Sequence, residues 1–189
     1  INSGRSGSIM PLEPITKILQ EIMTALTQPK IVMVGMYGTS NANRENMVEK
    51  VSRRVERDRL FNVVVKISVM KKPDLKRIQG ELGKALGLQL HEKTLEERAI
   101  RLCERIKMKN KILIILDHLE GQINLANIGI PFGNDHKGCK ILLVAQNKEL
   151  LDKMKTQIVF SVDEEAMRSH QVQTMGKLLW IKMCCCPVN

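Results

Sequence analysis

The fold of this chain is decided by residues 31–48, with the sequence IVMVGMYGTSNANRENMV. Residues 31–34 are apolar and largely β-branched, which predicts a buried strand that runs directly into Gly35 and Gly38. A polar loop follows, and residues 44–57 are predicted to form an amphipathic helix. Strand, tight loop and helix in this order present backbone N–H groups and a helix N-terminus to an anion such as phosphate.

The loop keeps the spacing of the phosphate-loop pattern GxxxxGK[ST] but loses its chemistry. Starting at Gly38, it has Asn43 at the second glycine, Arg44 at the lysine and Glu45 at the hydroxyl residue. Asn43 places a side chain where the backbone should approach phosphate, and the planar guanidinium of Arg44 is not interchangeable with an ammonium. Glu45 removes the magnesium-binding hydroxyl and places a carboxylate beside the β-phosphate position. Two like charges about 4 Å apart repel by roughly 4 kcal/mol at an effective dielectric constant of about 20. Alternatively, Arg44 and Glu45 are ordinary first-turn helix residues, so the loop alone does not predict a phosphate site.

The remaining periodicities alternate between strands and helices. Apolar runs predict strands at residues 63–69, 111–117, 139–145 and 158–162. Helical stripes or start signals predict helices at residues 14–26, 75–86, 94–106 and 148–153, and a further helix starting at Asp163. The third of these opens with a capping box, TLEE, and its inward face includes Cys103. We therefore predict an α/β fold, a P-loop NTPase-like three-layer sandwich with a mostly parallel five-stranded sheet.

A carboxylate closes the most apolar of these strands. Asp117 ends the run KILIILD, and an acidic residue at the tip of such a strand holds Mg²⁺ in phosphate-loop proteins, often through water. The next residue, where a second acid could orient a water molecule, is His118. Asp117 is thus the candidate metal ligand, although a strand-end aspartate also serves simply as a cap.

Composition excludes several classes of function. The net charge is +10, but the basic residues, Arg98 among them, are spread over predicted helix faces. Aromatic residues make up only 3% of the chain, so it has no stacking platform for single-stranded nucleic acid, and nucleic-acid binding is not expected. No apolar run is long enough to span a membrane and no secretory segment begins the chain, which favours a soluble, cytoplasmic protein.

The cysteines and the two ends of the chain complete the organisation. Cys103 and Cys139 are expected to be reduced core thiols, while the run Cys184 to Cys186 has no paired CxxC or nearby histidine for zinc. Residues 1–10 are expected to be a linker, 11–168 one domain and 169–189 an irregular tail. Because the chain begins with Ile1, it is expected to be a fragment or an incomplete gene model.

In the order of its segments the chain resembles the NB-ARC nucleotide-binding domain of plant coiled-coil NLR disease-resistance proteins. The resemblance covers about residues 12–167 and rests on these segments: IVMVGMYG, LFNVVVKISV, PDLKRIQGELGKALGL, RAIRLCERIK, KILIILDHLE, IGIPFGNDHKGCKILLVAQ and DEEA. It implies a switch in plant defence that binds ADP or ATP with Mg²⁺ and acts with other NLR-type proteins or signalling partners. The nucleotide-binding residues that it implies are Gly38, Thr39, Ser40, Asn41, Ala42, Asn43, Arg44, Glu45 and Asn46.

The chain departs from the family pattern at residues with a chemical role in the site, and not at residues that pack in the core. Besides the loop, His118 replaces a second Walker acid, and Val144, Ala145 and Gln146 replace a Thr-Ser-Arg whose arginine senses the terminal phosphate. The resemblance therefore implies a retained fold with weak nucleotide binding and no ATP hydrolysis. Two alternatives stay open, namely a nucleotide-free interaction or decoy module, and the product of a pseudogene.

Overall fold

A computed structural model describes residues 14–132, 136 and 138–163 of the chain. Within these residues, strands and helices alternate as predicted. Their bounds are α1 Pro14–Thr27, β1 Met33–Tyr37, α2 Asn41–Arg57, β2 Val63–Met70, α3 Leu75–Ala85, α4 Leu95–Lys107, β3 Ile112–Leu119, α5 Leu125–Ile128, β4 Cys139–Ala145, α6 Lys148–Lys153 and β5 Ile158–Ser161. The predicted linker, the tail with its cysteine run and the helix proposed to start at Asp163 lie outside the described residues, apart from Asp163 itself.

The strands form one sheet in the order β2-β3-β4-β1-β5, and every pairing is parallel. This confirms the predicted five-stranded α/β architecture. Two strands continue two or more residues past their predicted ends, and several of the other boundaries differ by one or two residues. β1 continues through Gly35 to Tyr37, because it pairs with β4 and β5 as far as Tyr37. β3 continues to Leu119, which pairs with Met70, so Asp117 lies inside the strand and not at its end.

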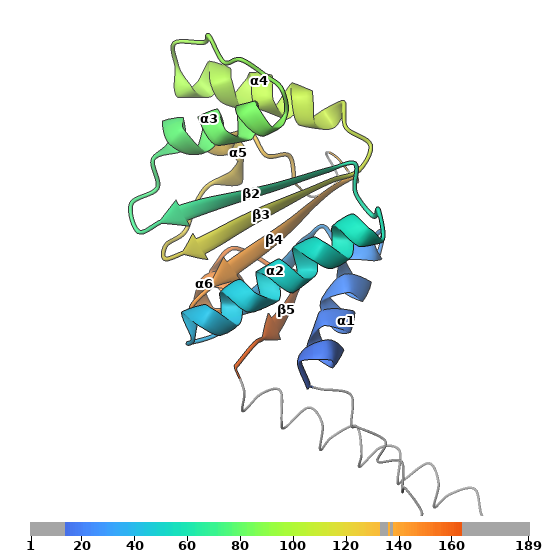
Figure 1. Ribbon diagram of the computed structural model, residues 1–189. Coiled ribbons are helices and arrows are strands. Elements are labelled where there is room, and N and C mark those ends of the chain that lie inside the picture. Colours follow the sequence, from blue (N-terminus) through green and yellow to red (C-terminus); the bar gives the residue numbers. More distant parts are fainter. Residues whose placement is uncertain (1–13, 133–135, 137, 164–189) are drawn as a thin grey trace, which may run out of the picture.

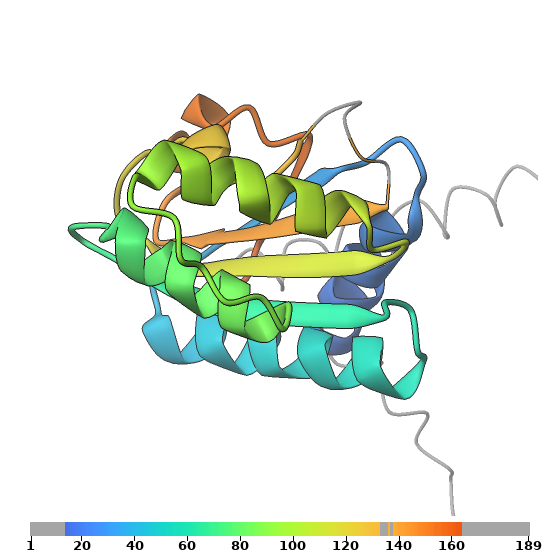
Figure 2. The ribbon, with the colours of Figure 1, turned by 90° about the horizontal axis from the view of Figure 1, so that it is seen from above.

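Helices cover both faces of the sheet and make three layers (Figure 1). Alternate side chains of β3 enter two separate cores, Ile112, Ile114 and Leu116 on one face and Leu113 and Ile115 on the other. The first core packs against α3, α4, α5 and α6, and the second against α1 and α2. Viewed from above, α3 and α4 lie over the sheet and α2 lies on its far side (Figure 2). Because every strand runs the same way, all carboxyl ends meet at one edge, where α2 also begins.

α4 differs from its predicted amphipathic pattern. The capping box is confirmed, with Thr94 accepting from the Glu97 backbone N–H and Glu97 accepting from that of Thr94. However, Arg98 is buried at 9% exposure and Cys103 is only half-buried, so the expectation of a solvated Arg98 and a core Cys103 is wrong. Cys139 is buried as predicted, and its burial raises the pKa of the thiol to about 12.

Lys140 is a buried amine that ties the start of β4 to the loop before β1. It is 6% exposed and donates to the backbone oxygens of Gln28, at 2.6 Å, and Ile31. Its pKa is lowered from the usual 10.5, chiefly because burial penalises the charged form. The two hydrogen bonds therefore partly offset the free-energy cost of removing the amine from water.

We expect Lys140→Met to lower the free energy of unfolding by about 1–2 kcal/mol at neutral pH, because both carbonyls lose a charged donor. At pH values between the lowered pKa of Lys140 in the folded state and 10.5, the unfolded state binds more protons than the folded state. The free energy of unfolding of the wild type therefore rises with pH in this range, and that of the variant does not. Urea unfolding of both proteins at neutral and alkaline pH measures the two effects. A variant as stable as the wild type at neutral pH would contradict them.

Candidate functional site

The candidate site lies at the carboxyl edge of the sheet, where β1 passes into α2. The connecting loop contains only residues 38–40. It is fixed to the neighbouring strands, since the Gly38 N–H donates to the Ala145 oxygen at 3.4 Å and the Val162 N–H donates to the Tyr37 oxygen at 2.8 Å. In parallel α/β folds this edge is where ligands bind.

The helix after the loop begins earlier than predicted. It starts at Asn41 and not at Arg44, so residues 41–46 of the proposed phosphate loop form its first turns. Ser40 is the N-cap, and its side chain accepts from the Asn43 N–H at 3.3 Å. Without a glycine at position 43, a serine cap followed by residues that tolerate a helix favours continuous helix over an open loop. The backbone between β1 and α2 is therefore a three-residue turn.

Arg44 folds back over this turn instead of pointing into solvent. Its guanidinium donates to the backbone oxygen of Gly38, to that of Thr39 at 3.3 Å and to the Asn41 side-chain oxygen at 3.1 Å. A phosphate-loop lysine would direct its charge to a bound phosphate. Here the charge at that position is used to hold the loop's own carbonyl groups.

The carboxylate of Asp163, two residues after the end of β5, also contacts the turn. Asp163 Oδ1 accepts from the Thr39 N–H at 2.8 Å and from the Thr39 hydroxyl at 3.0 Å. A Cβ on Gly38 would lie 2.8 Å from Val162 Cγ2 and 3.1 Å from Asp163 Oδ1, so only glycine fits beside this contact. Sequence reasoning assigned Asp163 to a helix start and missed this role. No local sequence pattern indicates this contact; the register of the sheet sets it, because Tyr37 pairs with Ser161 and two further residues bring Thr39 to Asp163.

Asp117, the candidate metal ligand, is buried close to the loop. The residue is 1% exposed, and its Oδ1 accepts from the His118 N–H at 2.8 Å. Oδ2 has no hydrogen-bond partner among the described residues, although Lys66 Nζ forms an ion pair with it at 3.4 Å. A buried carboxylate oxygen without a hydrogen-bond donor is energetically unfavourable unless another group satisfies it.

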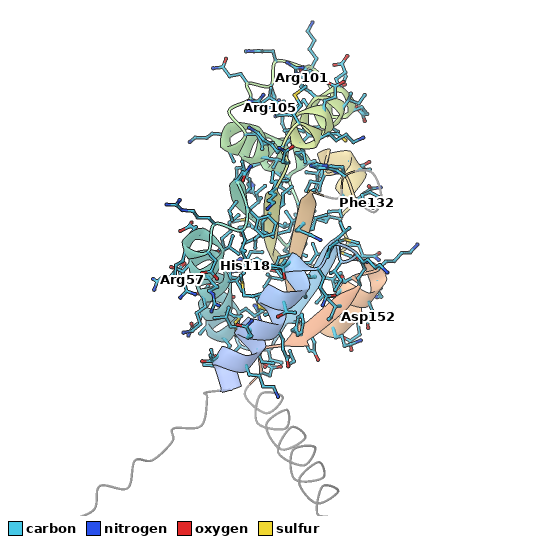
Figure 3. The ribbon with its side chains drawn as sticks, turned by 90° about the vertical axis from the view of Figure 1, so that its right-hand side faces the viewer. Arg57, Arg101, Arg105, His118, Phe132 and Asp152 are labelled. Carbon is cyan, nitrogen blue, oxygen red and sulfur yellow. The ribbon has the colours of Figure 1, made fainter. Side chains whose placement is uncertain are left out.

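His118 brings two predicted site residues together. Its Nε2 lies 3.6 Å from Glu45 Oε1, its Nδ1 lies 3.5 Å from Asp117 Oδ1, and Ser68 Oγ is 3.4 Å from the same Nδ1. Figure 3 labels His118 near the middle of the molecule. Glu45 also accepts from the Asn41 side-chain amide at 2.8 Å, so it is engaged on both sides. Despite these contacts, the described part of the chain has no group of three or more His, Cys, Asp or Glu residues arranged to hold a metal ion.

Gln146, at the position implied for a phosphate-sensing arginine, directly follows Ala145, which accepts from the Gly38 N–H, but it lines a different cavity. It lines a cavity of about 560 Å³ with Glu120, Asn147, Glu149 and Lys153, and none of residues 38–46 lines that cavity. The structure thus brings the loop, Asp117, His118 and Glu45 together and leaves Gln146 in a separate polar hollow. Chemically, the site offers a helix N-terminus and a buried carboxylate.

Strand order, loop and helix define a P-loop NTPase-type α/β domain. Solved structures agree at the level of the fold. The Aeropyrum pernix ORC2 protein, solved in its ADP form, matches with a TM-score of 0.52 and 15% identity, covering 79% of this chain and 47% of that one. A chain of Drosophila ORC bound to DNA matches with a TM-score of 0.52 and 12% identity, covering 78% and 91%.

The family itself is shown by a sequence model. That of the NB-ARC domain matches residues 14–175, most of the chain, so this chain belongs to the NB-ARC family. Among curated Arabidopsis thaliana proteins, the disease resistance protein SUMM2 is 27% identical over 154 residues, covering 77% of this chain and 17% of SUMM2. The probable disease resistance protein At5g47260 is 29% identical over 139 residues, covering 74% and 14%. The chain therefore spans about a sixth of the length of these relatives. Within the described residues, no helix has the length and apolar character needed to cross a membrane.

Proposed function

We propose that this domain is an adenine-nucleotide-binding switch module of a plant disease-resistance receptor, with weak affinity for ADP or ATP and no hydrolysis. Its family and its relatives support the role in plant defence. The observation that carries the weak affinity is the internal saturation of the loop, in which Arg44 holds the carbonyl groups and Asp163 holds the Thr39 N–H. A phosphate that binds the Thr39 N–H must displace Asp163, and the Arg44 guanidinium must leave the carbonyl groups before it can bind a phosphate.

The residues fit a nucleotide with Mg²⁺ only in part. Asn41 and Ala42 are the first two residues of α2, and backbone N–H groups at such positions lack intrahelical acceptors. These two groups would receive a phosphate, favoured by the helix dipole. Asp117 would hold Mg²⁺ through water, and the ion would neutralise phosphate charge. The Oδ2 atom of Asp117 is the oxygen left without a hydrogen bond.

Hydrolysis is not expected, because the charges that would support it are missing. Glu45 adds a carboxylate where the pattern has a metal-binding hydroxyl. His118 stands where a second acid would orient the attacking water, and it contacts Glu45 and Asp117 instead. Phosphoryl transfer depends almost entirely on positioning and charge stabilisation, so these changes remove its main sources of rate. The proposed location is the cytoplasm, and the proposed partners are other NLR-type proteins or signalling proteins.

The second candidate function is an interaction module that binds no nucleotide. The same contacts of Arg44 and Asp163 favour it, since a loop satisfied by its own chain needs no ligand for stability. The two functions differ in one respect that can be measured. In the switch, removing an internal contact exposes a usable phosphate site, whereas in the interaction module it only destabilises the loop.

We expect Asp163→Asn to raise the affinity for ADP with Mg²⁺ about fivefold, because it removes a negative charge that repels phosphate and weakens an acceptor of the Thr39 N–H. Titration calorimetry of the variant and the wild type measures the change. Glu56→Gln is the matched control, since it removes the same charge from an exposed position on α2 and should leave affinity unchanged. An unchanged affinity of Asp163→Asn would favour the interaction module.

A further inference from the structure

Two hollows on the α4–α6 side of the sheet meet at one exposed aromatic side chain, that of Phe132. A cavity of about 670 Å³ lies between the start of β1, the α5 region and the end of α6. A second cavity of about 380 Å³ lies between α4 and the segment that follows α5. Phe132 lines both and is 43% exposed. Figure 3 shows it at the margin of the molecule, between Arg101 and Arg105 of α4 and Asp152 of α6. We call the two cavities together the Phe132 groove.

The lining of the Phe132 groove is apolar over much of its length. Met33, Leu125 and Met154 line the first cavity. Ile100 and Ile130 line the second, and Ile100 is 62% exposed. Leu125 and Ile130 are buried and Ile100 and Phe132 are exposed, and exposed apolar side chains beside an apolar hollow are typical of interaction sites.

Hydrogen bonds hold the walls of the groove in place. The Gln157 side chain accepts from the Val32 N–H at 2.6 Å and the Met33 N–H at 3.0 Å, and it donates to the Lys30 oxygen at 2.9 Å. On the other wall, Asn124 caps α5 by accepting from the Ala126 N–H at 2.9 Å. The groove is therefore formed before any partner arrives, which lowers the entropy lost on binding.

The rim of the first cavity is positively charged. Lys30, Lys153 and Lys155 line it and are exposed, and none of them takes part in the ion pairs of the described residues. By contrast, nearby Lys148 is paired with Asp152 at 2.7 Å. Among the residues that the structure describes, Glu96 in the second cavity is the one acidic residue that lines the groove. Three lysines facing an apolar floor make a surface whose electrostatic complement is an acidic and apolar ligand.

We propose that the Phe132 groove docks an acidic amphipathic helix from a partner protein. The helix lays its apolar side on Phe132 and the floor of the groove, and its carboxylates face the three lysines. Two cavities that share Phe132, with an apolar lining and lysines at the rim of the first, suit the apolar and acidic faces of such a helix. Neither cavity is lined by residues 38–46, so this docking is independent of the proposed nucleotide site.

The test uses a labelled synthetic helical peptide with Leu and Phe on one face and Glu elsewhere. A second peptide has the same apolar face with Lys in place of Glu. Fluorescence anisotropy measures binding to the full chain, and NMR of the isotope-labelled chain maps the contact. We expect saturable binding of the acidic peptide, with shifts at Phe132, Met154 and Lys155, and weaker binding of the basic peptide.

Charge reversal separates this groove from general attraction to a basic protein. Lys153→Glu with Lys155→Glu should weaken the acidic peptide about tenfold, as should Phe132→Ala. The control is Lys71→Glu with Lys72→Glu, which makes the same charge change at exposed positions after β2 and should have little effect. Thermal unfolding confirms that each variant is folded. No saturable binding, equal binding of the two peptides, or an equal loss in the control would overturn the proposal.

Discussion

Replacing Asn43, Arg44 and Glu45 together by glycine, lysine and threonine is expected to raise the affinity for ADP with Mg²⁺ about a hundredfold, or about 2.7 kcal/mol. Three physical changes contribute. Glycine at position 43 weakens the first turn of α2, by about 1 kcal/mol on the helix scale, and lets the backbone approach phosphate. Lysine at 44 releases the carbonyl groups of Gly38 and Thr39. Threonine at 45 supplies a hydroxyl for the metal and removes a carboxylate.

The triple alanine variant at the same three positions is the matched control. It breaks the same side-chain contacts of Arg44 and Glu45 but restores neither the glycine nor the lysine nor the hydroxyl. We expect its affinity to rise less than about tenfold, because removing the obstruction leaves the site without its own charge and metal ligand. Calorimetric titration of both variants, after thermal unfolding has shown that they are folded, measures the difference. If the reverted chain binds no better than the alanine chain, the loop chemistry does not limit affinity.

Gln79→Leu is expected to lower the free energy of unfolding by about 3 kcal/mol, through the loss of one buried polar network. Gln79 is fully buried and donates to the backbone oxygens of Leu95, at 2.9 Å, and Asn127, at 3.0 Å. Its own oxygen accepts from Arg98 Nε at 3.0 Å. One amide thus connects α3, α4 and α5. Leucine fills a similar volume but removes all three hydrogen bonds, and it leaves the buried Arg98 Nε without its acceptor.

A double-mutant cycle shows whether the network itself is responsible. Arg98 also donates to the Lys76 oxygen at 3.3 Å, so it is the second member of the network to remove. In Gln79→Leu with Arg98→Met, no guanidinium is left unpaired, and we expect the double variant to lose less than the sum of the two single losses. Denaturant unfolding measures the free energy of unfolding of all three variants, provided that its dependence on denaturant concentration has the same slope in each. Strict additivity, or a loss below about 1 kcal/mol for Gln79→Leu, would mean that the network contributes little.

The architecture could be predicted from the sequence because its elements are strongly local. β4 has the predicted bounds, residues 139–145, since the apolar run 141–145 lies between a loop rich in glycine and proline and a polar cap. The spacing of Thr94 and Glu97 is enough to predict the start of α4. Where the sequence pattern is ambiguous, the observed boundaries differ from the predicted ones. For example, α2 begins three residues before the predicted start at Arg44.

The parts that could not be predicted depend on tertiary contacts between polar groups. A sequence pattern places Arg98 among solvated charges, and only the packing of α3 against α4 brings the amide of Gln79 to it. Asp163 lies 124 residues from Thr39, and the pairing of β5 with β1 sets that contact. Periodicity finds buried apolar faces, but it does not report which polar groups meet inside them. At the candidate site, the sequence therefore predicts the strand and the helix but not the contacts of Arg44 and Asp163 with the turn between them.

Calorimetric titration of the wild-type chain with ADP and with ATP, each with Mg²⁺, tests the proposed function most directly. The protein is first shown to be folded and free of co-purified nucleotide. We predict saturable binding with a dissociation constant of about 100 µM or weaker, and no conversion of ATP to ADP. Binding tighter than about 1 µM would show that Arg44 and Asp163 do not obstruct the loop, and the absence of saturable heat would contradict a nucleotide switch.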